Sequence, residues 1–550
     1  MNNVQPQWIA KMYAGKTGRD HLGLGSVSSD QILPSLSPGI NVLTFHPRYH
    51  SFYIFLLYEF WQRDIVRNRS NWIAFYRPRE FVFSAGAFQC DQESHGEMRN
   101  VVGGQKTGSA DIQAKEVFDT SFHYIDSPLG GYGLYYRTVM AEMGLILPGG
   151  PGLPAPVDVP TPDFGEKVAL AFREAIKDTT YYQKFFKENK AEIPLDIVKE
   201  YIREACLCRL KTPEAPDHTL LLELFTEKGK LQDAQARRET FRLFLDLAKQ
   251  TDGTPLDDDL FRQLIYFQSG DAGLSYMPTA SVMSTYIRWR LYQAREYYAY
   301  ALNALWGYLS AWGIAVRGET QSISLDEFWQ HLEKSLDFTA FAQHLGLDVP
   351  GLSFNSGARD LLAWVSTVGI AGTNDLEKGY QKNSLNEHSL YELIGNQKVW
   401  QGVELTAMFT LLLLVAERFN DPGIRLRPEW EISKMGANGR LSVDRFLREL
   451  YGSIEGGATI GEIIKWIYRT YIITQHQIVS SSKLPDNTFR FRLDGKQLRF
   501  YNLPNPLSFM NSRFDAISTT IYELGLCGDL KTREHALSTS GKKLLEEGNL

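Results

Sequence analysis

The closing segment of the chain, residues 513–550, carries the pattern that most limits what it can fold into. Apolar side chains recur at helical spacing from Phe514 to Leu524, and Gly525 follows them. A glycine just past the last apolar residue is typical of a left-handed helix cap. A polar stretch comes next, and Leu537-Ser538-Thr539-Ser540-Gly541 then opens a short basic helix. This order predicts a winged-helix-like unit.

Part of the same pattern occurs a second time, nearer the start of the chain. Residues 135–146 form a helical stretch that ends in Glu142-Met143-Gly144-Leu145, which matches Glu523-Leu524-Gly525-Leu526. A helix, then Glu-apolar-Gly-Leu, then a polar stretch is a common layout in winged helices, which bind duplex DNA or other proteins. No repeat period of about 20 to 50 residues runs through the chain, so this is a pattern that occurs twice and not a repeat architecture.

Size and composition set the broad class. A chain of 550 residues exceeds what one core ordinarily organises, and its 43% apolar and 22% charged residues are globular values. The net charge of −6 argues against a general polyanion binder but allows local basic faces. Four cysteines do not make a disulfide framework, and no signal-peptide pattern opens the sequence. The most hydrophobic stretch, residues 405–415, is too short for a membrane span. We expect a cytoplasmic protein without membrane contact.

Periodicity and turn residues predict a mainly α fold with minor β, multi-domain, in which a helical body precedes the winged-helix-like unit. Residues 49–61 and 278–316 carry strong buried-helix patterns, and alternation around Asp494-Gly495 predicts a β-hairpin. The expected parts are a mixed N-terminal domain (1–147), a Pro-rich linker (148–162), a helical domain (163–322), a second helical block (323–479), and the hairpin with the winged-helix-like unit (484–550).

Candidate metal and nucleotide sites all depart from the patterns that the chemistry requires. His46 and His50 are four residues apart, but a proline lies between them and no glutamate follows the first histidine. Cys206-x-Cys208 lacks a second pair, and Cys90-Asp91-x-Glu93-x-His95 is interpreted as a solvated loop. The Gly-Lys-Thr at 15–17 lacks both the first P-loop glycine and a preceding strand. We therefore assign no metal ligand and no cofactor.

No catalytic residue is assigned either. Asp178 with Glu188-Asn189-Lys190 matches the letters of a metal-dependent nuclease, in which two carboxylates hold the metal. The residues between them have a helical pattern, whereas that site needs a strand, so a solvated charged helix is favoured. A non-enzymatic protein is the favoured interpretation, and an active site assembled from distant residues stays open as an alternative.

Basic residues towards the end of the chain are the candidate nucleic-acid contacts, because such contacts need exposed cationic or amide groups. The candidates are Arg490, Arg492, Lys496, Arg499, Arg513, Lys542 and Lys543. Protein docking or plain architecture is the alternative for this unit. The aromatic-basic helix 286–298 has apolar residues at helical spacing, which favours a core helix with Arg288 and Arg295 facing solvent.

Several segments together carry a resemblance to a known group. They are Leu22-Gly23-Leu24-Gly25-Ser26, Leu36-Ser37-Pro38-Gly39-Ile40, Arg48-Tyr49, Gly130-Gly131-Tyr132-Gly133 with Tyr135-Tyr136, and Glu142-Met143-Gly144-Leu145, with the closing segment 513–541. The chain resembles an uncharacterised group of bacterial proteins often encoded beside helicases and nucleases in antiviral defence loci. The resemblance implies a defence context and supplies no mechanism. In that context we expect a non-enzymatic subunit of a defence or DNA-processing complex, whose winged-helix-like unit contacts duplex DNA and whose helical body binds other subunits. A metal-dependent nuclease or hydrolase, or a purely protein-binding scaffold, is the alternative.

Overall fold

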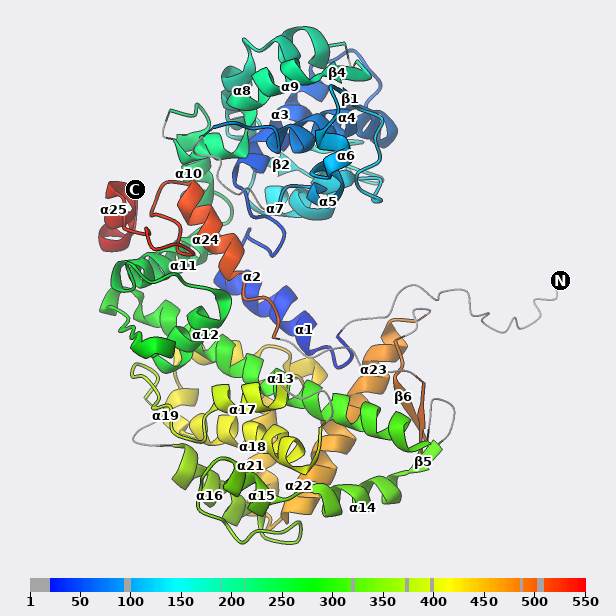
Figure 1. Cartoon of the computed structure of the whole chain (residues 1–550), viewed down its shortest axis with the longest axis vertical. Helices are drawn as coiled ribbons and strands as arrows, with labels where there is room; N and C mark the ends of the chain where they lie inside the picture. Colours follow the sequence, from blue (N-terminus) through cyan, green and yellow to red (C-terminus); the bar gives the residue numbers. More distant parts are fainter. Residues whose placement is uncertain are drawn as a thin grey trace, which may run out of the picture. The chain divides into compact units, whose positions relative to one another are not determined.

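The structure, a computed structural model, describes residues 20–92, 100–188, 190–212, 214–317, 322–370, 375–395, 400–484, 488–501 and 509–550. The Gly-Lys-Thr at 15–17, together with Glu93, His95 and Asn189, lies outside these residues. Helices dominate the described chain and strands are few and short (Figure 1). The prediction of a mainly α fold with minor β is therefore confirmed.

The chain divides into two compact units, each assembled from separate stretches of sequence. Unit 1 contains the described residues of 20–32, Arg262–Met277 and Tyr286–Met510. Unit 2 contains the described residues of Leu33–Phe261, Pro278–Thr285 and Asn511–Leu550. These units are not the parts expected from the sequence, because distant stretches of the chain pack into one core.

Two of the expected boundaries differ from this division. The Pro-rich stretch 148–162 lies inside unit 2, where residues 148–158 connect two paired strands, β2 (Ile146–Leu147) and β3 (Val159–Pro160). The stretch 484–550 is shared out, since the hairpin belongs to unit 1 and the residues from Asn511 onward to unit 2. Composition alone could not separate a proline-rich loop from a linker.

Unit 2 is a helical body with two small antiparallel strand pairs, β1 with β4 and β2 with β3. Its helices are α2 (Leu33–Leu36), α3 (Arg48–Trp61), α4 (Arg69–Ala87), α5 (Gly104–Thr107), α6 (Ala110–Gln113), α7 (Arg137–Glu142), α8 (Gly165–Ile176), α9 (Leu195–Ala205), α10 (His218–Glu227), α11 (Leu231–Gln250), α24 (Phe514–Glu523) and α25 (Thr539–Glu547). Its other strands are β1 (Val117–Asp119) and β4 (Glu192–Pro194).

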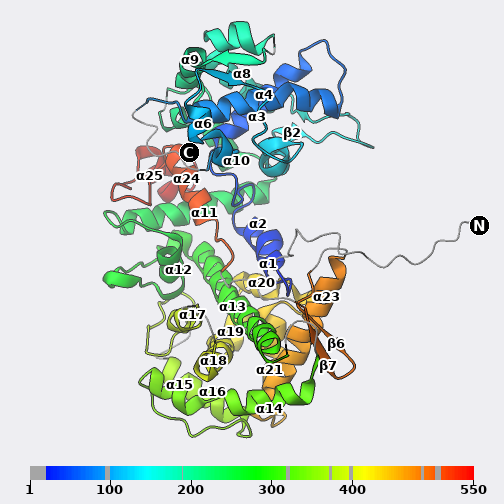
Figure 2. The ribbon, with the colours of Figure 1, turned by 45° about the vertical axis from the view of Figure 1, so that its right-hand side comes forward.

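Aromatic side chains fill the core of unit 2. Helix α3 is the buried helix that the pattern at 49–61 predicts, and it packs against α8. The ring of Phe52 stacks on that of Phe83 in α4, with centroids 4.0 Å apart, and meets Phe172 of α8 edge-on. The closing helices α24 and α25 lie beside α11 in both ribbon views (Figure 1, Figure 2).

Unit 1 holds the remaining helices and a three-stranded sheet in the order β5-β7-β6. Its elements are α1 (Leu24–Val27), α14 (Leu325–Ser335), α15 (Phe338–His344), α16 (Ala358–Gly369), α17 (Glu387–Gly395), α18 (Gly402–Arg418), α19 (Pro422–Arg425), α20 (Glu431–Lys434), α21 (Val443–Glu455), α22 (Ile460–Ile467), α23 (Gln475–Ser482), β5 (Ser322–Ser324), β6 (Phe491–Asp494) and β7 (Gln497–Phe500). Helices α12 (Asp258–Phe267) and α13 (Met283–Arg317) have residues in both units. The predicted hairpin is confirmed as β6–β7, with Gly495 in the turn at φ +60°.

Helix α13 confirms the core-helix interpretation of the aromatic-basic segment, since Ile287, Leu291 and Tyr298 are buried. Arg295 is also buried, contrary to its expected solvent position, and donates a hydrogen bond to Ser28 Oγ at 2.9 Å. Arg288 is only partly exposed and pairs with Glu431 at 3.1 Å. Among the described residues, none of the helices has the length and apolar character to cross a bilayer.

Candidate functional site

The two matching sequence patterns form the same arrangement of hydrogen bonds in unit 2, and we call them the first and second Gly-cap motifs, each running from one helix to the end of the next (137–176 and 514–547). In the first, Gly144 follows the end of α7 with φ +77°, and the Leu145 N–H donates to the Met140 carbonyl at 2.9 Å. In the second, Gly525 follows the end of α24 with φ +68°, and the Leu526 N–H donates to the Ile521 carbonyl at 3.0 Å. Both are left-handed C-caps, so the predicted cap at Gly525 is confirmed.

The likeness continues beyond the caps. The Leu145 carbonyl accepts hydrogen bonds from the N–H and the hydroxyl of Thr161, at 2.9 and 3.1 Å. The Leu526 carbonyl accepts the equivalent pair from Ser538, at 3.1 and 3.0 Å. Each hydroxyl oxygen then accepts an N–H from a glycine at the start of the next helix, Gly165 or Gly541, both at 3.0 Å. The pattern that occurs twice in the sequence thus also occurs twice in the backbone.

The loops of the two motifs differ. In the first, the buried carboxylate of Asp158 accepts hydrogen bonds from Tyr132 Oη at 2.6 Å, Arg137 Nε at 2.8 Å and the Gly149 N–H at 2.8 Å. This network fixes both ends of the loop 148–158. In the second, the bridge between Cys527 and Leu537 closes the loop 528–536. Buried Leu530 and His535 anchor this loop to residues 251–256, and residues 531–534 between them are exposed.

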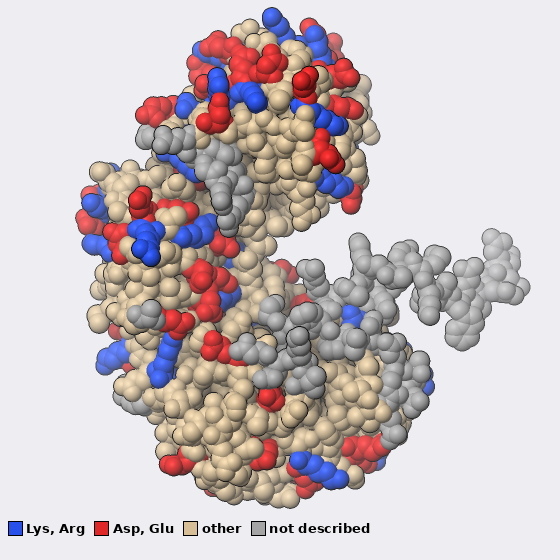
Figure 3. Space-filling model, in the orientation of Figure 1, with Lys and Arg blue, Asp and Glu red and all other residues tan. Residues whose placement is uncertain are grey.

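The second motif exposes basic side chains at two places. Lys531 and Arg533 are exposed in its loop, and Lys542 and Lys543 are exposed near the start of α25. The positive end of the α25 dipole lies at the same end of the helix as these lysines, while the exposed acidic residues of α25 lie at the opposite end. Figure 3 shows acidic and basic side chains interspersed on the face in view. Basic side chains therefore do not form one continuous surface on that face.

The helix before the loop is a core helix. Most of α24 is buried, and the ring of Phe514 packs on Phe244 and Phe261 with centroids 5.8 and 5.2 Å apart. Arg513, a predicted nucleic-acid contact, is only 6% exposed, and its guanidinium donates to the carbonyls of Ser37 and Ile40. Arg513 is therefore corrected from a surface contact to a buried link within unit 2, because its side chain turns inward to backbone carbonyls.

The hairpin β6–β7 of unit 1 displays three of the other candidates. Arg492, Lys496 and Arg499 are exposed, and Arg492 lies directly opposite Arg499 in the antiparallel register. Like charges directly opposite each other destabilise a strand pair. Arg490 is the exception, because its side chain is fully buried, so it too is corrected from a surface contact. The candidates thus fall into two separate sets, one in each unit.

Two of the segments that carry the resemblance form buried polar contacts in unit 2. The backbone N–H groups of Gly131 and Tyr132 donate to the buried Glu80 carboxylate at 3.2 and 3.1 Å. Arg48 forms a fully buried ion pair with Asp217, Nε to Oδ2 at 3.2 Å. These contacts give the residues an architectural role.

Two of the histidines considered as metal ligands, His46 and His50, have hydrogen-bond partners of their own, and neither belongs to the described group of metal-ligand side chains that contains Cys90. His46 Nδ1 lies 2.8 Å from Glu523 Oε1, and His50 Nδ1 lies 3.0 Å from the Pro47 carbonyl. Burial lowers the pKa of His50 to about 4. A buried histidine of this kind is neutral at physiological pH and packs as a polar core residue.

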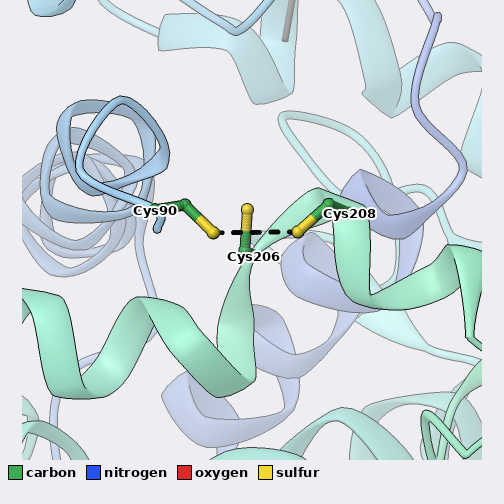
Figure 4. Close-up of side chains that lie close together, drawn as sticks. All are labelled: Cys90, Cys206 and Cys208. Carbon is green, nitrogen blue, oxygen red and sulfur yellow. Dashed lines mark hydrogen bonds between the residues drawn. The ribbon is translucent and has the colours of Figure 1, made fainter. Parts of the chain in front are cut away.

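The structure instead brings together three cysteines that the sequence analysis kept apart. The thiol sulfurs of Cys90, Cys206 and Cys208 lie within 4.8 Å of one another, and those of Cys90 and Cys208 are 3.7 Å apart (Figure 4). Hydrogen bonding to Cys208 and Cys90, together with burial, raises the pKa of the Cys206 thiol well above its usual range. The sequence signal was Cys206-x-Cys208, but its third member is over a hundred residues away.

In the described part of the chain, Asp178 and Glu188 of the nuclease hypothesis do not belong to a group of side chains close enough to share a metal ion. Tyr181–Phe186 is helical, as the periodicity predicts, and Lys190 pairs with the exposed Glu188 at 3.0 Å. No protein-family model, curated protein or solved structure matches this chain.

Proposed function

We propose that the chain is a non-enzymatic, cytoplasmic subunit of a bacterial antiviral defence or DNA-processing complex. It contacts duplex DNA through the second Gly-cap motif, which acts as a winged-helix-like unit, and other subunits through its helical body. The resemblance of its sequence supplies the setting. The observation that carries the DNA contact is the exposure of four basic side chains in this motif, Lys531 and Arg533 in its loop and Lys542 and Lys543 in α25.

The burial of α24 decides how the unit meets DNA. A helix packed on both Phe244 and Phe261 is unavailable for the major groove, so base-specific recognition by α24 is excluded from the proposal. The loop 528–536 and the start of α25 remain available to contact the phosphates of the DNA. Phosphate contacts position a protein on DNA without reading its sequence, so binding is expected to be independent of DNA sequence and sensitive to salt.

The hairpin β6–β7 offers a second phosphate contact in unit 1. Arg492 and Arg499 occupy opposed positions of the ladder, where two like charges cost stability. A bound phosphate would relieve this repulsion. Lys496, exposed at the turn, adds a third positive charge to the same hairpin.

Fluorescence anisotropy with labelled duplex DNA tests the proposal, with single-stranded DNA and RNA measured in parallel. Each phosphate contact contributes about −0.9 to the slope of log affinity against log salt concentration for duplex DNA. Replacing the four basic residues of the second motif by alanine should therefore make the slope shallower by about one unit for each phosphate neutralised in the unaltered chain. The variant residues are Lys531, Arg533, Lys542 and Lys543.

Two further variants sharpen the result. A hairpin variant with Arg492, Lys496 and Arg499 replaced by alanine should reduce the slope independently of the first. A control variant, Lys184→Ala with Lys187→Ala, removes two exposed charges elsewhere in unit 2 and should leave the slope unchanged. An unchanged slope in the four-residue variant, or an equal reduction in the control, would remove the second motif from the account. Tighter binding to RNA or single-stranded DNA would contradict duplex DNA as the partner.

A further inference from the structure

The three-cysteine cluster of unit 2 supports an inference that is independent of the DNA contact. We propose that Cys90, Cys206 and Cys208 form a binding site for one thiophilic metal ion, with Zn²⁺ as the probe. Two sulfurs bound to zinc at about 2.3 Å in tetrahedral geometry lie about 3.8 Å apart. The separation of 3.7 Å between the sulfurs of Cys90 and Cys208 matches this edge.

The presence of three thiols, and not two, favours a metal site over a disulfide. A disulfide joins two sulfurs, whereas all three of these side chains point towards a common centre (Figure 4). Thiolates are soft ligands that favour zinc and Cu(I) over harder ions. Three protein ligands leave a fourth position open, as in zinc sites that take a water or an exogenous ligand. Cys90 is the partly exposed member, so we place the entry path on its side.

Close packing of two helices creates the cluster. Cys90 follows the end of α4 by three residues, and Cys206 is the C-cap residue of α9. Gly86 allows this approach, because an added Cβ would lie 2.9 Å from Val198 Cγ1 of α9. The carbonyl ends of both helices therefore lie next to the sulfurs. Helix C-terminal ends carry partial negative charge, which favours a bound cation.

Buried hydrogen bonds hold the α9 side of the cluster. Arg48 donates from Nη1 to the carbonyls of Cys206 and Glu204, at 2.5 and 2.9 Å. The same guanidinium is paired with Asp217, so its position is fixed. On the other side, Asp91 pairs with Arg203 of α9 at 2.8 Å, which ties the residue after Cys90 to the same helix. Cysteine side chains that are already held in place lose little conformational entropy when they bind a metal ion.

Metal binding replaces the thiol protons. The three protonated thiols would release three protons as three metal–sulfur bonds form, with no change of oxidation state. Protons compete with the ion for the three sulfurs. The apparent affinity should therefore fall as pH decreases.

Titration of the full-length, reduced and chelator-treated chain with Co²⁺, followed by displacement with Zn²⁺, tests the proposal. We expect the sulfur-to-cobalt charge-transfer absorption of a thiolate site, saturating at one ion per chain, and weaker binding at pH 6 than at pH 8. Cys90→Ser and Cys206→Ser should each weaken binding by at least about tenfold. Cys527→Ser is the matched control, since Cys527 is buried in the same unit but lies outside the cluster.

Circular dichroism checks the fold of each variant. Cys90→Ser alters a partly exposed side chain and should fold normally, so it decides the question if Cys206→Ser unfolds. Absence of charge-transfer absorption in the unaltered chain would overturn the proposal. Binding that is unchanged in a folded Cys90→Ser variant would overturn it as well, because the ion would then be held elsewhere.

Discussion

The two Gly-cap motifs share the same cap, carbonyl, hydroxyl and glycine contacts, yet their loops have different fates. The first loop is clamped at both ends by Asp158, which also binds Tyr132 and Arg137. The second loop exposes residues 531–534 and carries basic side chains. The glutamates at the two helix ends differ in the opposite sense, since Glu142 of the first motif is exposed and Glu523 of the second is buried against His46.

The same local arrangement of hydrogen bonds therefore precedes two loops that are held differently. The shared contacts require only a glycine, a hydroxyl residue and a second glycine, so they are specified within short segments of sequence. Whether a loop is held in place depends on other residues. Asp158 holds the first loop, and Phe244 and Phe261 pack against α24 in the second motif. A duplicated pattern therefore predicts a duplicated backbone and leaves the function of each copy to its surroundings.

The largest expected effect is on the clamped loop. Asp158→Ala removes a buried carboxylate, which leaves Tyr132 Oη without this acceptor and Arg137 with the Gly149 carbonyl alone. We expect a decrease of about 3–5 kcal/mol in the free energy of unfolding, measured by urea denaturation. The matched change in the second loop, Asp529→Ala, removes one local hydrogen bond to the Lys531 N–H and should cost below about 1 kcal/mol. Equal decreases in the free energy of unfolding for the two variants would contradict the difference between the two loops.

The next effect should be common to both motifs. An added Cβ at Gly541 would lie 1.9 Å from the Leu526 carbonyl oxygen, and one at Gly165 would lie 2.3 Å from that of Leu145. Each glycine-to-alanine change should therefore cost about 1–3 kcal/mol in thermal or urea unfolding. Gly452, a helical glycine with open space around its Cβ position, is the control. Its change to alanine should stabilise the protein by about 0.5–1 kcal/mol.

The smallest effect should be equal in the two caps. Gly144 and Gly525 both adopt positive φ, and neither has a close neighbour that an added Cβ would strike. Alanine at either position should cost about 1 kcal/mol, because only the left-handed conformation is penalised. Calorimetric midpoints of the two variants should agree. A clear difference between them would show that the caps are not equivalent.

The helices of this fold follow from periodicity, because burial on one face is a local property of sequence. Patterns at 49–61 and 278–316 predict α3 and α13, and the turn at Asp494-Gly495 predicts β6–β7. The division into units does not follow, because Asn511–Leu550 packs with stretches that lie hundreds of residues earlier. Nothing in a single sequence marks such a long-range pairing.

The candidate sites show the same limit. Exposed charge was predicted correctly at Lys542 and Lys543, where short basic segments lie on a surface helix. Arg490 and Arg513 belong to equally basic segments and are buried, because distant parts of the chain cover them or supply their acceptors. The cysteine cluster was missed since Cys90 and Cys206 meet only through the packing of α4 on α9.

Hydrogen–deuterium exchange of the full-length chain, with and without duplex DNA, tests the central claim most directly. Without DNA, the Gly149 amide, bonded to the buried Asp158, should exchange slowly. The amides of Lys531, Thr532 and Glu534 bond only to residues within the same exposed turn, so they should exchange faster. Addition of DNA should slow exchange across the loop 528–536 and the start of α25, and leave the loop 148–158 unchanged. Equal protection of both loops, or a DNA effect confined to the first, would contradict the account.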